Sequence, residues 1–127
     1  MEKLVDDYIK FVSPTILKKD QNLYAIRTTF LDQFNDSICL YARGNDDFSE
    51  ITVEDDGDTL RYLEDPEDIF KFKGAEELFD NIVKMELNDG VLSIKTTREK
   101  FGQDLHFFIQ NLIELNCLMW AGEYLDE

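Results

Sequence analysis

Two groups of acidic residues have the types and the spacing for chemistry with a divalent metal ion. Asp32 and Asp36 flank one turn, and a second turn at 54–58 has the sequence Glu-Asp-Asp-Gly-Asp. If the fold brings both turns together, their carboxylates could hold a metal ion that activates water, as in nucleases. The ligands would be Asp32, Asp36, Asp55 and Asp56. One hypothesis is therefore a metal-dependent or degenerate nuclease-like domain that uses Asp32, Asp36 and the turn at 55–58.

Three features argue against this metal chemistry. The β-rich stretch at 51–54 lacks an E-x-K pairing, and the sequence offers no basic surface to hold a phosphate backbone. The turn at 54–58 also lacks the spacing and the closing glutamate of a calcium-binding loop. Asp and Asn side chains at turns ordinarily bond to the backbone of the same turn. We therefore expect these carboxylates to cap turns, and we expect no metal or other cofactor.

Nucleophilic catalysis has few candidate residues in this chain. His106 is the only histidine and lies in the aromatic run 105–108, which is typical of a packed or surface side chain. One histidine and two distant cysteines do not make a zinc site at ordinary spacing, and no glycine-rich phosphate loop is present. Cys39 and Cys117 lie in apolar runs, so we expect two buried free thiols. These absences favour a protein without enzymatic activity.

Negative charge is concentrated in one part of the sequence. Residues 46–68 contain eleven acidic side chains and one base, a net −10 of the chain's −15. Such a surface repels nucleic acid and anionic membranes, and it attracts basic protein surfaces through a long-range field. We therefore expect no direct nucleic-acid or membrane binding, and a partner with a basic surface, such as a nucleic-acid-binding protein. The expected contact residues are Asp46, Asp47, Glu50, Glu54, Asp55, Asp56, Asp58, Glu64 and Asp65.

Length and composition are those of one folded unit. The 127 residues are 43% apolar, which is enough for one core, so we expect a single domain over 1–127. No apolar run approaches the roughly 20 residues that span a bilayer. Asp6 and Asp7 interrupt the apolar pattern at the N-terminus, unlike a secretory signal. These features predict a cytoplasmic protein.

The first half of the chain predicts one helix and three strands. Apolar residues at helical spacing indicate a helix that begins near Leu4 and ends at Ser13-Pro14. Stretches rich in β-formers predict strands at 23–29, 37–43 and 50–54, with alternate residues inward.

The second half predicts a middle helix or two, a hairpin and a long helix. Asp65-Pro66 has the features of a helix start, and a further helix is expected at 75–83. Asn88-Asp89-Gly90 indicates a two-stranded hairpin, and the longest helix is expected at 103–124. The order predicts an α+β domain. Its antiparallel sheet has about five strands, and the long C-terminal helix packs on it.

The long C-terminal helix carries two apolar stripes. Ile109 and Leu112 lie at the centre of the first stripe and are expected to be buried. The two stripes end in Met119, Trp120 and Tyr124, so these residues are expected to form a groove for a homodimer or another partner.

Two segments resemble the motifs of a known family. Residues 29–41 (TFLDQFNDSICLY) and 51–60 (ITVEDDGDTL) are similar to its pattern (T/S)PFLDxxNDxIxIY … LTDDGxT. It is a bacterial and prophage family described only as a domain of unknown function, the eighteen-twenty-eight family. Thr29 replaces the usual proline, and Val53-Glu54 replaces Leu-Thr. The resemblance implies a mobile-element context and no assigned activity, and it draws attention to Asp32, Asn35, Asp36, Asp55, Asp56 and Gly57.

The leading hypothesis from the sequence is a non-enzymatic, acidic protein-binding module. It would be carried by a phage or prophage and would occupy the basic, nucleic-acid-binding surface of a host defence protein, such as a CRISPR effector or a restriction enzyme, partly mimicking DNA. The order of elements also resembles the class I type III secretion chaperones. That resemblance implies a third hypothesis, a dimeric chaperone or immunity-type partner protein.

Overall fold

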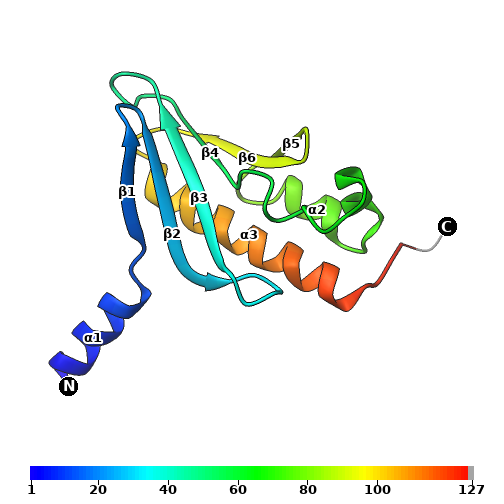
Figure 1. The fold of residues 1–127 in the computed structure, drawn as a ribbon, viewed down its shortest axis with the longest axis horizontal. Helices are drawn as coiled ribbons and strands as arrows, with labels where there is room; N and C mark the ends of the chain where they lie inside the picture. Colours follow the sequence, from blue (N-terminus) through cyan, green and yellow to red (C-terminus); the bar gives the residue numbers. More distant parts are fainter. Residues whose placement is uncertain (126–127) are drawn as a thin grey trace.

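A computed structural model describes residues 1–125 of the chain. Its elements, labelled in Figure 1, are α1 (Glu2–Val12), β1 (Thr15–Asp20), β2 (Leu23–Leu31), β3 (Ser37–Gly44), β4 (Ile51–Glu54), the 3₁₀ helix η1 (Pro66–Lys71), α2 (Ala75–Phe79), β5 (Glu86–Asn88), β6 (Val91–Thr96) and α3 (Phe101–Ala121). The expected α+β class, with an N-terminal helix and a long C-terminal helix, is confirmed. None of the helices in this part of the chain is long and apolar enough to cross a membrane.

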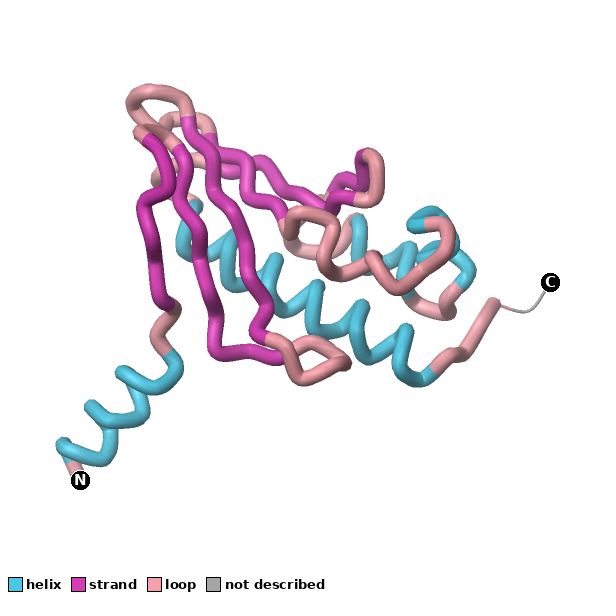
Figure 2. Tube along the Cα trace, viewed as in Figure 1, coloured by secondary structure: helices cyan, strands magenta, loops and turns pink. Residues whose placement is uncertain are grey.

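The strands form one antiparallel sheet in the order β1-β2-β3-β4-β6-β5 (Figure 2). The β5–β6 hairpin turns through Asp89 and Gly90, both with positive φ, as a two-residue hairpin turn of the mirror-image type requires. Because β6 pairs with β4, this hairpin extends the sheet and places the Gly90 turn close to the loop after β4.

The core lies between the sheet and α3, which crosses one face of it (Figure 1). Strand alternation turns Leu40, Val53 and Ile94 toward that face, and all three are fully buried. Leu112 of α3 is fully buried as expected. The expectation for Ile109 is wrong, because Ile109 lies on the flank of the buried stripe and is only half-buried.

The sheet has six strands instead of about five, because β1 was not predicted. Its sequence, TILKKD, does not alternate, and all six residues are exposed. Backbone pairing with β2 holds this edge strand, and such pairing leaves little trace in side-chain pattern.

Two further expectations differ from the structure. The helix expected at 75–83 ends at Phe79, where the Phe79 carbonyl accepts a hydrogen bond from the Met85 amide at 3.0 Å and the chain turns back. The cysteines are free, but Cys39 is only half-buried and Cys117 is exposed, because they lie on faces that the core does not cover.

Candidate functional site

Asp32 organises the turn between β2 and β3. Its Oδ1 accepts hydrogen bonds from the amides of Phe34 (2.8 Å) and Asp36 (3.0 Å). The Asp32 amide donates to the Asp36 carbonyl at 2.8 Å, and Asn35 has a positive φ of 65°. Asn and Asp tolerate that conformation best among residues with a side chain. The Asp32 carboxylate therefore caps this turn, as expected for Asp at such a position.

Asp55 holds the turn after β4 and is only 1% exposed. Its Oδ1 accepts from the amides of Gly57 (2.9 Å) and Leu92 (3.0 Å), and its Oδ2 accepts from the Thr59 amide (3.0 Å). Burial raises the pKa of Asp55 above its ordinary value of 3.8, and the hydrogen bonds from this turn and from Leu92 oppose that rise. The prediction that Asp55 belongs to a partner-binding surface is wrong, because its carboxylate faces the interior.

The two motif segments meet against the second half of α3. Asp32, Asp55 and Asn116 line one small cavity of about 10 Å³, which is near the size of a single water molecule. Asn116 closes it by accepting from the Gln33 amide at 3.2 Å and donating to the Leu112 carbonyl at 2.9 Å. We call this place the motif junction. Its dimensions are those of a packed structural contact.

Arg61 joins the two motif segments at the surface of the junction. Its guanidinium pairs with Asp58 at 2.8 Å and with Asp36 at 3.3 Å. The guanidinium also lies over the Tyr62 ring, which contacts the Phe34 ring. The pattern of residues in the sequence indicated no role for Arg61 or Asn116. The one available signal was that Arg61 is the only base among residues 46–68.

The alternative metal site is not assembled in residues 1–125. No group of three or more His, Cys, Asp or Glu side chains there could hold a metal ion. Asp32 and Asp55 already accept backbone hydrogen bonds, and Asp56 is exposed.

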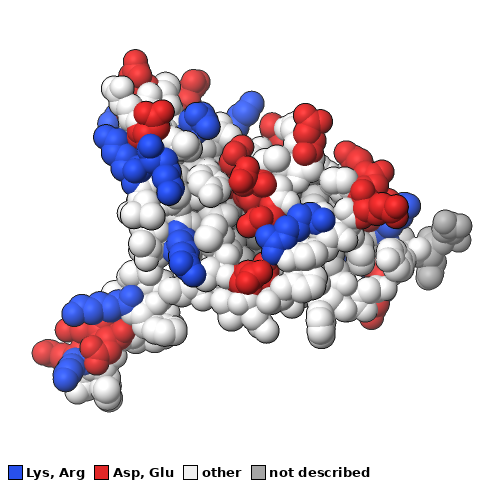
Figure 3. Space-filling model, in the orientation of Figure 1, with Lys and Arg blue, Asp and Glu red and all other residues white. Residues whose placement is uncertain are grey.

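Eight of the nine expected contact residues remain at the surface, and we call them the acidic surface. They are Asp46, Asp47, Glu50, Glu54, Asp56, Asp58, Glu64 and Asp65. The first three lie at the β3–β4 turn, Glu54 ends β4, and the rest follow in the loop before η1. In Figure 3, acidic side chains occupy the middle of the visible face and the end that carries η1 and α2.

Few of these carboxylates are neutralised by a neighbouring base. The ion pairs within residues 1–125 join Arg61 to Asp36 and Asp58, and Lys71 to Asp68. Only Asp58 of the acidic surface takes part. The pKa of Asp47 is lowered by its hydrogen bonds with Ser49, so this carboxylate is ionised at neutral pH. The surface therefore carries nearly its full negative charge.

Of the residues expected to form a partner groove, Met119 packs half-buried against the core, whereas Trp120 and Tyr124 lie in different surroundings. Trp120 is 76% exposed and lines a groove of about 450 Å³ with Leu31, Ile113 and Cys117. Tyr124 lies beyond the end of α3 at Ala121, and its ring packs on Phe72 with centroids 4.8 Å apart. Tyr124 is therefore wrongly assigned to the apolar stripe of this helix.

A family model described as "Domain of unknown function DUF1828" matches residues 28–115. The chain belongs to this family. The DUF1828 match begins in β2 and ends in α3, so it contains both motif segments and the acidic surface, while α1 and β1 precede it. Comparisons with curated proteins and with solved structures gave no match.

Proposed function

We propose that this chain is a non-enzymatic, acidic protein-binding module whose partner is a basic, nucleic-acid-binding protein. The observation that carries the proposal is the acidic surface, of whose eight carboxylates seven are exposed, Glu54 is half-buried, and only Asp58 is paired with a base. Unpaired, ionised carboxylates produce a field that steers a basic partner and speeds association. The same field repels nucleic acid, so the protein is expected to compete with DNA or RNA and not to bind it.

The proposed setting is a phage or prophage inhibitor that takes the place of DNA on a CRISPR effector or a restriction enzyme. Two features support a binding role over catalysis. The carboxylates best placed for metal chemistry, Asp32 and Asp55, already accept backbone hydrogen bonds. The carboxylates of Asp32 and Asp55 are then accounted for by their structural hydrogen bonds, and the accessible charge of the acidic surface remains for recognition.

The test starts with the tagged chain as bait in a lysate of the bacterium that carries the gene. Binding is then measured with the purified partner. Wild type should displace labelled duplex DNA from that partner, and its association should slow steeply as salt screens the charges. The triple variant Glu50→Gln, Asp56→Asn, Glu64→Gln should associate roughly three- to tenfold more slowly.

A matched control removes three exposed charges of α1, through Glu2→Gln, Asp6→Asn and Asp7→Asn. This control should associate at the wild-type rate, because its charges lie outside the acidic surface. Equal rates for all three proteins, with no salt dependence, would overturn the proposal. A rise in melting temperature with Mg²⁺ or Mn²⁺ that Asp32→Asn abolishes would overturn it in favour of the metal-dependent alternative.

A further inference from the structure

The N-terminal arm, which we define as α1 and β1, exposes an apolar face that its own chain does not cover. The helix α1 is strongly amphipathic, yet none of its residues is buried. Leu4 and Tyr8 are each 66% exposed, and Phe11 is 75% exposed. In Figure 1, α1 projects away from the sheet and from α3. It contacts its own chain at β2, where the Thr29 hydroxyl donates to the Val12 carbonyl at 3.3 Å.

The exposed area is large for a protein of this size. Nine large apolar side chains of the arm and the adjoining end of β2 are 45–75% exposed. They are Leu4, Val5, Tyr8, Ile9, Phe11, Ile16, Leu17, Phe30 and Leu31. The five on α1 share one face of the helix and expose on the order of 600 Å², the upper end of the 300–600 Å² typical of the largest patch on a monomer. One partner in a standard interface contributes about 800 Å². The apolar face of α1 alone therefore approaches the area of one side of a protein interface.

A groove beside the outer stripe of α3 also exposes apolar side chains. Leu31, Ile113, Cys117 and Trp120 form its apolar part, and Asp32, Gln33, Asn35 and Asn116 line the rest. The 21 residues of α3 include two acidic side chains and no lysine or arginine, although 32% of the whole chain is charged. A charge-poor, solvent-facing helix is typical of a surface that another protein covers. The 11-residue α1 is about 16 Å long, enough to span the roughly 11 Å between Ile113 and Trp120.

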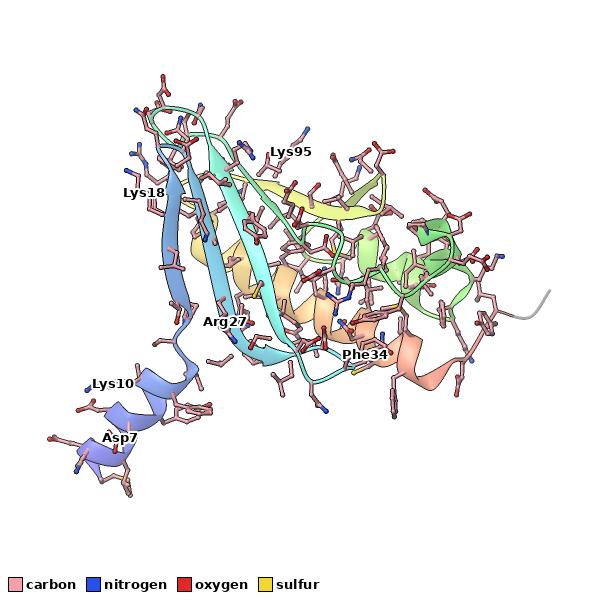
Figure 4. The ribbon with its side chains drawn as sticks, viewed as in Figure 1. Asp7, Lys10, Lys18, Arg27, Phe34 and Lys95 are labelled. Atoms are coloured by element: carbon pink, nitrogen blue, oxygen red, sulfur yellow. The ribbon has the colours of Figure 1, made fainter. Side chains whose placement is uncertain are left out.

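Charge favours a second copy of this chain as the occupant. Residues 1–43 contain six bases and six acidic side chains, so the entire net charge of −15 lies in residues 44–127. Residues 44–127 of two copies repel each other, whereas the neutral arm can approach that part of another copy. Lys10, Lys18 and Arg27, labelled in Figure 4, lie on α1, β1 and β2. Glu2, Asp6, Asp7 and Asp20 balance the four bases of the arm, so the arm as a whole is neutral.

We propose that the arm of one chain docks in the α3 groove of a second copy, and that the second arm docks reciprocally. A reciprocal exchange closes as a two-fold dimer. Each chain contributes both halves of the interface, so no other protein is needed to cover either surface. The acidic surface lies outside both halves. Formation of the dimer therefore does not depend on the proposed partner, and the two proposals are tested separately.

Sedimentation velocity of the full chain is the first test. Wild type at micromolar concentration should sediment at twice the 14.9 kDa chain mass. Leu4→Gln with Tyr8→Gln should weaken the dimer roughly tenfold or more, without loss of folded structure, because both side chains are exposed. The matched control, Lys3→Gln with Lys10→Gln, changes the polar face of the same helix and should leave the dimer intact.

Disulfide trapping identifies the groove. Two differently tagged chains are mixed, and both carry Cys39→Ser. The first also carries Tyr8→Cys and Cys117→Ser, and its cysteine at position 8 should cross-link to native Cys117 of the second chain. When Lys10→Cys replaces Tyr8→Cys in the first chain, no cross-link should form. A monomeric wild type would overturn the proposal, and its binding to phosphatidylcholine vesicles would assign the arm to lipid. A dimer insensitive to the arm variant, or equal trapping from positions 8 and 10, would also overturn it.

Discussion

Neighbouring carboxylates in the turn after β4 have opposite roles. Asp55 is buried and accepts three backbone hydrogen bonds, whereas Asp56 is exposed with a positive φ of 56°. One of the three donors, the Leu92 amide, comes from the start of β6, 37 positions further along the chain. Asp55 thus joins two strands as well as closing its own turn.

Replacing Asp55 by Asn should destabilise the fold by about 1–3 kcal/mol, the usual cost of leaving a buried polar group unsatisfied. The amide oxygen can serve the Gly57 and Leu92 amides. The amide nitrogen then faces the Thr59 amide, which loses its acceptor. Urea unfolding at neutral pH measures the change. Asp56→Asn is the control and should change the free energy of unfolding by less than about 0.5 kcal/mol.

The contribution of Asp55 to stability should decrease as pH rises. Because burial raises its pKa above 3.8, the folded protein binds the Asp55 proton more tightly than the unfolded chain between that value and the raised pKa. By linkage, the contribution of Asp55 to the free energy of unfolding is largest below pH 3.8 and decreases between pH 3.8 and the raised pKa. Above the raised pKa the contribution is constant. The free energy of unfolding of wild type minus that of Asp55→Asn, measured across pH, isolates the effect. A difference that grows with pH would show that the hydrogen bonds outweigh burial.

At the scale of elements, α3 supplies the side of the core opposite the sheet, so truncating its centre should be costly. Leu112→Ala should lose about 2–5 kcal/mol, because Leu112 is fully buried and the sheet cannot collapse into the space it leaves. Chemical denaturation gives the value. Ile109→Ala, on the half-buried flank of the same helix, should lose distinctly less. Similar losses at both positions would mean that the helix packs in a different rotation.

At the scale of the whole molecule, the net charge of −15 opposes the compact state. Few ion pairs within residues 1–125 offset this repulsion, and those of Arg61 and Lys71 are exposed. Raising salt from low to physiological concentration should therefore raise the melting temperature, since screening lengths shorten to about 8 Å. Sodium chloride and potassium chloride should raise the melting temperature equally, because screening depends on ionic strength and not on which cation is present. A melting temperature that falls with salt would show that attractive pairs dominate.

The sequence by itself determined the features that depend on neighbouring residues. Alternation at 37–43 and 50–54 was sufficient for two strands, the second of which begins one residue later, at Ile51. Asp89-Gly90 was sufficient for the hairpin turn, because turn conformation is set within a few positions. The helical spacing of Leu112 in α3 likewise predicted its burial. The family motif was recognisable for the same reason, since its residues lie in two short segments.

Only the tertiary structure decided which of two adjacent aspartates is buried, because that depends on the Leu92 amide from a distant strand. It also decided that residues 15–20 pair as a strand, since backbone hydrogen bonds with β2 form there without an alternating apolar pattern. Burial and edge pairing are properties of what lies opposite a residue in space. The tertiary structure also decided that the apolar face of the arm is exposed. Helical spacing predicted an apolar stripe on α1, but only the fold showed that nothing within residues 1–125 covers it.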